Sequence, residues 1–133
     1  MFLRKVAPMI AVGALVAILA GCTGSGGGSA SPAAPKGDTV KGKEVFDSTC
    51  ISCHGADAKG MPNLGKNLVV KSDWMKKQDD AALVAFVKIG RPATDPLNTT
   101  KVDMPPRGGN PSISDDDIVN VIAYVRTLQA ASK

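Results

Sequence analysis

The pentapeptide Cys50-Ile51-Ser52-Cys53-His54 constrains this chain more than any other feature. Two thiols at this spacing can each add across a vinyl group of a haem, and the adjacent imidazole can then reach the iron from one face. His54 is the only histidine of the chain, and a purely structural histidine would leave the pattern without a purpose. We therefore expect one covalently bound haem c that forms part of the core.

Other interpretations of the cysteine pair are a zinc site, a redox-active dithiol or two buried cysteines. A tetrahedral zinc site needs four ligands, whereas two cysteines and one histidine are available once Cys22 is assigned as described below. A thioredoxin-like dithiol lies between a strand and a helix, and no alternating β-branched run precedes Cys50. A thiol oxidoreductase without haem is therefore kept as the weaker alternative.

The N-terminal segment has the pattern of a secretory signal peptide. Arg4 and Lys5 are followed by an uncharged apolar run over residues 6–20. Fifteen helical residues span roughly 22 Å, which is short of the hydrocarbon core of about 30 Å, so a permanent transmembrane helix is disfavoured. Removal of residues 1–21 leaves 14 basic and 12 acidic residues, a net charge of +2. This balance argues against a nucleic-acid-binding protein.

The residues around Cys22 predict how the mature protein is anchored. The stretch Leu19-Ala20-Gly21-Cys22 resembles the bacterial lipobox, in which cleavage before the cysteine leaves that residue lipidated. Residues 22–37 are rich in Gly, Ser and Pro and predict a flexible tether to a folded domain at 38–133. We expect an exported protein, held on a membrane by lipid and facing the periplasm or another extracytoplasmic side.

The first helix of the domain is expected over residues 40–49. An apolar face is suggested there by Val40, Val45 and Phe46. Gly42 lies inside this helix and costs about 1 kcal/mol relative to Ala, so we expect another element to approach it closely.

Two loops and two more helices follow. Residues 55–71 contain three glycines and no sustained period, which predicts a loop. Ser72 can cap a short turn, and a helix begins at Asp79 or Asp80 and ends at Gly90. A second loop, over residues 91–111, contains five prolines.

The last helix has the clearest signals. Ser114 followed by three aspartates is a strong helix start, because the hydroxyl and the carboxylates both stabilise free N–H groups. The apolar residues that follow share one face of a helix: Ile118, Val121, Ile122, Val125 and Leu128. We expect this helix to face the core.

With these motifs in this order, residues 38 to 130 resemble the class I cytochromes c, the small monohaem type. The motifs that carry the resemblance are Gly42 and Phe46 before Cys50-x-x-Cys53-His54-Gly55, then Pro62-Asn63-Leu64, Met104-Pro105-Pro106, and the segment from Ile118 to Leu128 with Tyr124 and Arg126. The resemblance implies an all-α fold of three to five short helices wrapped around one covalently bound haem.

The resemblance also implies roles for single residues. The first and last helices should cross where Gly42, Phe46 and Tyr124 meet. Pro62 should offer its carbonyl to Nδ1–H of the histidine, which fixes the ring. The methionine of the late loop, Met104, should be the distal iron ligand.

Three methionines of the mature chain are candidates for the distal ligand. Met61 follows His54 by only seven residues, a short path to the opposite face of a haem, and Met75 falls in a predicted helical turn where it would pack. Met104 lies in a proline-fixed loop, and Pro105 restricts its backbone to an extended form. We expect Met104 to bind the iron in an apolar pocket formed by Ile51, Leu64, Leu68, Val69, Leu83, Phe86, Val87 and Val102.

These residues predict an electron carrier rather than an enzyme, acting alone or as the cytochrome subunit of a larger oxidoreductase. The iron can change oxidation state without changing its ligands. The competing function is a haem enzyme or gas sensor, which needs an open distal site. The expected partners are a redox donor and acceptor, and the lysines of residues 59–77 suit an acidic docking face.

Overall fold

The structure, a computed structural model, describes residues 36–70 and 72–132. The predicted signal peptide, Cys22 and most of the predicted tether lie outside the described residues. Within these ranges the chain is all-α, as expected, and its only β-type pairings are two isolated bridges. None of the helices described has the length and apolarity that crossing a membrane requires.

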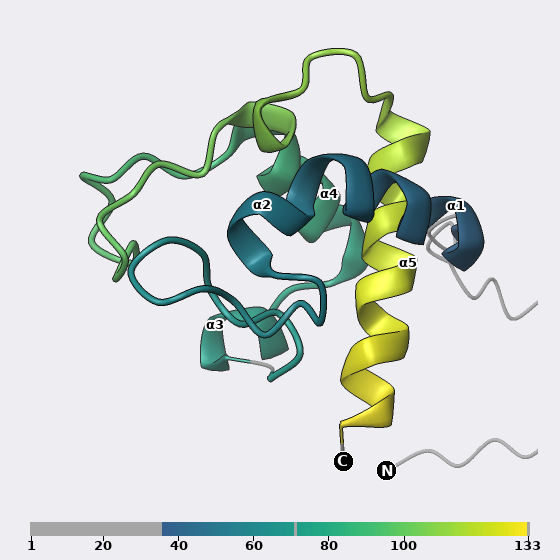
Figure 1. Cartoon of the computed structure of the whole chain (residues 1–133), viewed down its shortest axis with the longest axis horizontal. Coiled ribbons are helices and arrows are strands. Elements are labelled where there is room, and N and C mark those ends of the chain that lie inside the picture. Colours follow the sequence, from purple (N-terminus) through teal and green to yellow (C-terminus); the bar gives the residue numbers. More distant parts are fainter. Residues whose placement is uncertain (1–35, 71, 133) are drawn as a thin grey trace, which may run out of the picture. The chain divides into compact units, whose positions relative to one another are not determined.

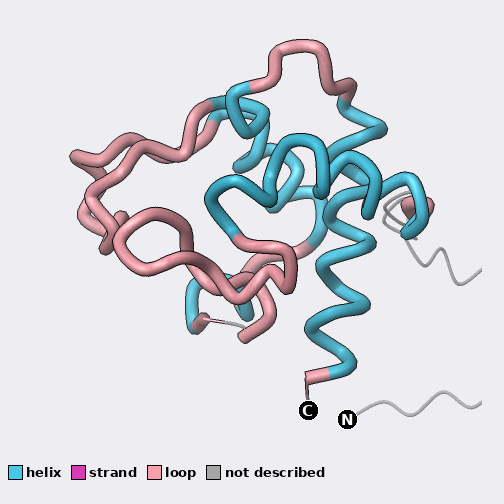
Figure 2. Tube along the Cα trace, viewed as in Figure 1, coloured by secondary structure: helices cyan, strands magenta, loops and turns pink. Residues whose placement is uncertain are grey.

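Most of the helical residues gather on one side of the domain and the longest loops on the other, with one short helix below the loops, as Figure 2 shows. Residues 55–70 and 90–105 form most of the loop side (Figure 2). The elements in chain order are α1 (Thr39–Val45), the π-helical turn η1 (Phe46–Cys50), α2 (Ile51–His54), α3 (Asp73–Lys76), α4 (Asp80–Ile89), the 3-10 turn η2 (Pro106–Gly109) and α5 (Asp115–Ala131).

The long helix α5 begins where the sequence predicts. The Ser114 hydroxyl accepts from the Asp117 amide, and the Asp117 carboxylate accepts from the Ser114 amide, so each residue satisfies a free N–H group of the other. The predicted apolar stripe is buried along α5, with Leu128 only partly covered. This stripe packs in the core with Leu83 of α4 and with Phe46. Phe46 and Ile118, the first residue of the stripe, are fully buried.

Helix α1 crosses α5, as Figure 1 shows, and Gly42 lies at the crossing. A Cβ atom added at Gly42 would lie 2.0 Å from the Asn120 carbonyl oxygen, so the two backbones touch. The rings of Phe46 and Tyr124 meet edge to face beside this contact, with centroids 5.5 Å apart. The expected crossing is confirmed. The inclusion of Val40 in the apolar face was wrong: Val40 lies about 200° around the helix from Gly42 and is exposed.

Between α1 and the cysteine motif the helix widens into the π-helical turn η1. Its signature is a hydrogen bond from the Ile51 amide to the Phe46 carbonyl, five residues back instead of four. The turn thus places one extra residue between the Gly42 face, which contacts α5, and the cysteines. The thiols and His54 consequently point to a different side of the helix from Gly42.

Helix α4 is fixed at both ends. The Asp79 carboxylate caps its first turn by accepting from the Ala82 amide, and Gly90 ends it with a positive φ of 75°. At that end Lys88 contacts Asp115, the first residue of α5, at 2.6 Å. Arg107 of η2 contacts the other oxygen of the same carboxylate, also at 2.6 Å. One carboxylate therefore joins α4, η2 and α5.

Candidate haem-binding site

The two cysteines of the motif lie at the wall of a cavity of about 400 Å³. Cys50 ends η1 and Cys53 lies one turn later in α2, which turns both side chains to the cavity. Both are free thiols and are half-buried. Burial, with a smaller contribution from the neighbouring Cys53, raises the pKa of the Cys50 thiol to about 11. Because both cysteines are free thiols at the cavity wall, both sulfurs are available for covalent attachment.

His54 lines the same cavity and is held by a backbone carbonyl. Its Nδ1 lies 2.8 Å from the carbonyl oxygen of Lys66, and since a carbonyl can only accept, Nδ1 carries the proton. Nε2 is then the nitrogen with a free lone pair. Burial lowers the pKa of His54, and the hydrogen bond to Lys66 partly opposes this shift. The neutral ring that results is the form that binds a metal.

The acceptor for Nδ1 is therefore Lys66, and the prediction of Pro62 was wrong. Pro62 is exposed at the tip of a tight turn closed by a backbone pair between Met61 and Gly65, and it does not line the cavity. Gly65 lies against the end of α2, where a Cβ would be 2.0 Å from the carbonyl oxygen of Cys53. This close approach carries the next carbonyl, that of Lys66, to the histidine ring.

A sequence signal for Lys66 exists, because the chain contains two Asn-Leu pairs. The first follows Pro62, and the second, Asn67-Leu68, follows Lys66. The proline made the first pair the more obvious match. The structure uses the second, with a lysine in front of it.

Met104 reaches the cavity from the opposite loop. Its backbone pairs with that of Arg91 through two hydrogen bonds of 2.8 and 2.9 Å, which fix the position where the loop leaves and rejoins the body. Met104 and Met75 line the cavity, whereas Met61 does not. Met75 is buried, and its sulfur is 3.5 Å from the side-chain amide nitrogen of Gln129. Met104 is thus the candidate best placed to bind a metal opposite His54.

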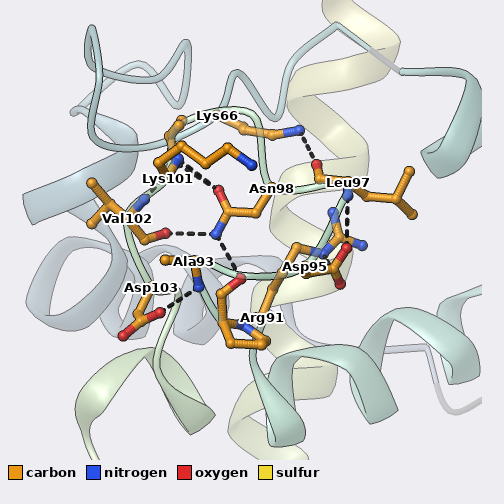
Figure 3. Close-up of polar contacts among 11 residues, drawn as sticks. Lys66, Arg91, Ala93, Asp95, Leu97, Asn98, Lys101, Val102 and Asp103 are labelled. Atoms are coloured by element: carbon orange, nitrogen blue, oxygen red, sulfur yellow. Dashed lines mark hydrogen bonds and ion pairs between the residues drawn. The ribbon is translucent and has the colours of Figure 1, made fainter.

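The loop between Arg91 and Met104 is organised by Asn98, which is 3% exposed. Its amide group donates to the carbonyls of Pro92 and Val102, at 3.1 and 2.8 Å. Its side-chain oxygen accepts from the Thr100 hydroxyl and the Lys101 amide. Figure 3 shows Asn98 at the centre of this network. The loop carries its own polar core, and sequence analysis did not anticipate it.

Arg91 is a second residue that sequence analysis missed. Its guanidinium lies over the rings of Trp74 and Phe86, 4.7 Å from each centroid, and lines the cavity. Nε lies 3.3 Å from Asp95 Oδ2 but outside hydrogen-bonding geometry, so it is buried without a hydrogen-bond partner among the described residues. We interpret the Asp95 contact as charge attraction only. Arg91 therefore presents a cation at the cavity wall.

These groups fit a haem. The predicted apolar lining is confirmed except for Ile51 and Val69, which do not line the cavity but pack at the core. The apolar walls suit the macrocycle, the two thiols suit its vinyl groups, and the buried Arg91 donor suits its carboxylates. Among the residues that the structure covers, no group of three or more His, Cys, Asp or Glu side chains is arranged to hold a metal ion. Fold and site together define an all-α domain of the c type, in which haem is attached through cysteines.

Comparison with known proteins agrees with this class. The family model described as cytochrome c matches residues 39–129, and the chain belongs to the cytochrome c family. Its cofactor is accordingly a covalently attached haem c. No solved structure matches the chain significantly.

The similar proteins are of two kinds, subunits of Cbb3-type cytochrome c oxidases and a cytochrome c-555. The chain is 32% identical over 87 residues to the Cbb3-type cytochrome c oxidase subunit CcoP of Rhodobacter capsulatus, covering 65% of this chain and 28% of that protein. It is 35% identical over 103 residues to subunit FixP of Azorhizobium caulinodans, covering 75% and 31%. Cytochrome c-555 of Prosthecochloris aestuarii is 28% identical over 88 residues, covering 66% and 85%. The chain thus spans less than a third of the oxidase subunits that it matches.

Proposed function

We propose that this protein is a one-electron carrier in which His54 and Met104 are the two iron ligands and Cys50 and Cys53 carry the thioether links. The observation that carries the proposal is that all four side chains line one cavity. They reach it from two segments far apart in sequence: the end of η1 with α2, which carries both cysteines and His54, and the loop that ends at Met104. A bound haem supplies an iron that changes oxidation state by one electron.

The side chains of the site favour electron transfer over catalysis. The Lys66 carbonyl orients His54 and raises the electron density on its ring. The Met104 thioether favours the reduced metal and leaves no open position for a substrate. The apolar lining keeps water out and disfavours the additional positive charge of the oxidised state. A haem enzyme or gas sensor would need the distal position free.

Replacing Met104 tests this assignment. Met104→Ala should abolish the weak ferric absorption band of an iron–sulfur(Met) bond and lower the reduction potential, because a thioether stabilises the reduced metal. Met61→Ala is the matched control and should change neither, since Met61 does not line the cavity. Wild-type protein that lacks the band and binds carbon monoxide rapidly in the ferrous state would favour the sensor or enzyme instead.

The proposed carrier is anchored to a membrane through Cys22 and faces the periplasm or another extracytoplasmic side. The support is the lipobox-like sequence and the tether that follows it. Two or three acyl chains hold a protein firmly on a membrane, whereas a single chain is marginal. Mass spectrometry of the native protein should show a mature N-terminus at Cys22 with its lipid mass. An unmodified Cys22 or cleavage elsewhere would contradict the anchor.

The similarity to oxidase subunits supports a membrane-bound terminal oxidase as the electron acceptor. In this role the protein supplies electrons that the oxidase passes to oxygen. Membranes from the host should oxidise the reduced protein, and cyanide should block that oxidation. Oxidation that is absent, or that cyanide does not slow, would point to another acceptor.

The lysines of residues 59–77 support an acidic docking face on the partner. Lys77 is exposed, whereas Lys59 contacts Asp57 at 3.5 Å and Lys76 contacts Asp73 at 3.0 Å, both on the surface. Exposed ion pairs of this kind are weak and leave most of the positive field in place. Stopped-flow electron transfer to the native partner should slow as salt is added. A rate independent of ionic strength would contradict electrostatic docking.

A further inference from the structure

The loop that ends at Met104 has few connections to the rest of the domain. Polar groups inside the loop form hydrogen bonds with Asn98. The two ends of the loop meet at the backbone pair between Arg91 and Met104, which we call its neck. Its tip has little apolar burial, because Leu97 is 52% exposed and Val102 is 37% exposed. The loop is therefore well ordered within itself and only lightly packed against the body.

One hydrogen bond joins the tip of this loop to the opposite side of the cavity. The Lys66 ammonium donates to the carbonyl oxygen of Leu97 at 2.8 Å, across 31 residues of chain, as Figure 3 shows. Within residues 36–70 and 72–132, it is the only hydrogen bond from residues 92–103 to any residue outside the loop and its neck. A hydrogen bond from a charged donor is stronger than one between neutral groups.

Lys66 also holds the opposite ligand, because its own carbonyl accepts from His54. The backbone of Lys66 is bound on the His54 side of the cavity, while its side chain reaches the Met104 side. The residue itself lines the cavity. A single residue thus connects the two loops from which the proposed iron ligands come.

From this geometry we infer that Lys66 is a positioning residue whose ammonium group ties the 92–103 loop across the edge of the cavity and so holds Met104 on the iron. The inference rests on the proposed ligation by Met104. Loss of the ammonium should release the tip of the loop, allow Met104 to leave the iron more often, and let small molecules in the solvent take its place.

The test compares three variants of the full-length, haem-loaded protein. Lys66→Met removes the donor and keeps an apolar stem of similar length, whereas Lys66→Arg keeps a charged donor. Lys101→Met removes one charge from the same loop, where only the Lys101 backbone amide bonds to Asn98. Two quantities are measured: amide hydrogen exchange of residues 95–102, and the rate at which imidazole binds the ferric protein.

Lys66→Met should speed both the exchange and the imidazole binding about fivefold, as expected for the loss of one charge-assisted hydrogen bond that is partly exposed to water. Lys66→Arg and Lys101→Met should stay close to the wild type. Unchanged exchange in Lys66→Met, or an equal effect in Lys101→Met, would overturn the inference. Faster exchange without faster imidazole binding would overturn the link to Met104.

The two proposals fail separately. If Met104→Ala keeps the iron–sulfur band, another methionine binds the iron and the proposed ligand set is wrong. Hydrogen exchange would still report whether Lys66 ties the loops together, because that measurement follows backbone opening and does not depend on the metal ligand.

Discussion

Gly65 is the residue on which the orientation of His54 depends. Its backbone lies against the Cys53 carbonyl so closely that no side chain fits between them. The peptide that follows is thereby held with its oxygen at His54 Nδ1. A glycine, which has no reactive side chain, thus determines which carbonyl accepts the hydrogen bond from the histidine.

A methyl group at Gly65 should disturb the histidine from a distance. In Gly65→Ala the new Cβ would meet the Cys53 carbonyl at 2.0 Å, so the 65–67 segment must move away from α2. We expect a loss of about 1–3 kcal/mol in the free energy of unfolding. We also expect a higher reduction potential, because a weaker Nδ1 hydrogen bond makes the imidazole a poorer donor to the oxidised metal. Chemical denaturation and a redox titration measure the two effects.

Pro62→Ala is the matched control for this prediction. Pro62 lies in the same turn but is exposed and away from the cavity, so the potential should not change. An unaltered potential in Gly65→Ala, or an equal shift in both variants, would contradict the role of the close contact.

Sequence analysis found the residues whose side chains are typical of the site, and missed those whose role depends on the path of the backbone or on packing. Cys50, Cys53 and His54 are recognisable because their proposed roles belong to their side chains. Lys66 acts on His54 through a main-chain carbonyl, which every residue has, so only the path of the loop selects it. Arg91 is usually a surface type, and its burial depends on stacking between two rings from other elements.

At the scale of elements, the crossing of α1 and α5 is the contact that brings the two ends of the domain together. We expect Gly42→Ala to force the helices apart, because the added Cβ would lie 2.0 Å from the Asn120 carbonyl. The better helix propensity of Ala offsets about 1 kcal/mol, which leaves a net loss of about 2 kcal/mol. Guanidinium unfolding of the haem-loaded protein measures it.

Glu44→Ala serves as the control for the crossing. Glu44 is exposed on the same helix, and such surface changes usually stay within about 0.5 kcal/mol. A Gly42→Ala protein as stable as Glu44→Ala would show that the two helices can separate without cost.

The junction of α4, η2 and α5 should make the domain sensitive to acid. Hydrogen bonds from Lys88 and then Arg107 hold the pKa of Asp115 below its usual value of 3.8. Below pH 3.8 the carboxyl of Asp115 therefore binds protons more readily in the unfolded chain than in the folded one. The stabilisation from this carboxylate is complete above that pH and is lost as the pH falls through the folded pKa. Asp115→Asn should flatten the pH dependence of stability in this window, as followed by thermal unfolding.

Asp116→Asn is the comparison for that variant, because no salt bridge joins Asp116 to another described residue. In Asp116→Asn, stability should fall with decreasing pH as steeply as in the wild type. Equal slopes in wild type and Asp115→Asn would mean that the junction does not depend on this carboxylate.

Three helix starts were predictable from their capping residues. Ser114, Asp79 and Ser72 all accept amide hydrogen bonds at the helix starts that their side chains predict. The π-helical turn η1 was not predictable, because a choice between hydrogen bonds four or five residues apart depends on what the helix packs against. The loop around Asn98 was missed for a related reason: an asparagine among prolines indicates a turn, not a buried centre.

At the scale of the whole molecule, the family match over residues 39–129 begins after the predicted tether. We therefore expect anchoring and electron transfer to be separable. Cys22→Ser should move the protein from the membrane to the soluble fraction after export, because the variant lacks the proposed lipid attachment site. The reduction potential of the released protein should equal that of the anchored one, since residue 22 precedes the whole family match.

Fractionation and voltammetry of the two forms check this prediction. The control is Thr23→Ala, which keeps the cysteine and should remain on the membrane. A Cys22→Ser protein that stays membrane-bound would indicate another means of attachment, and an altered potential would indicate that the tether touches the domain.

The extra residue in η1 sets the direction in which the side chains of the site point. Each residue of a helix advances the direction of its side chain by about 100°. The turn between Phe46 and Cys50 therefore rotates everything after it relative to the face that meets α5. Shortening this turn by one residue would keep every motif of the sequence and every helix of the fold. It would nevertheless swing the thiols and the imidazole away from the cavity, so the chain would retain the parts of a haem protein with its attachment groups facing the wrong way.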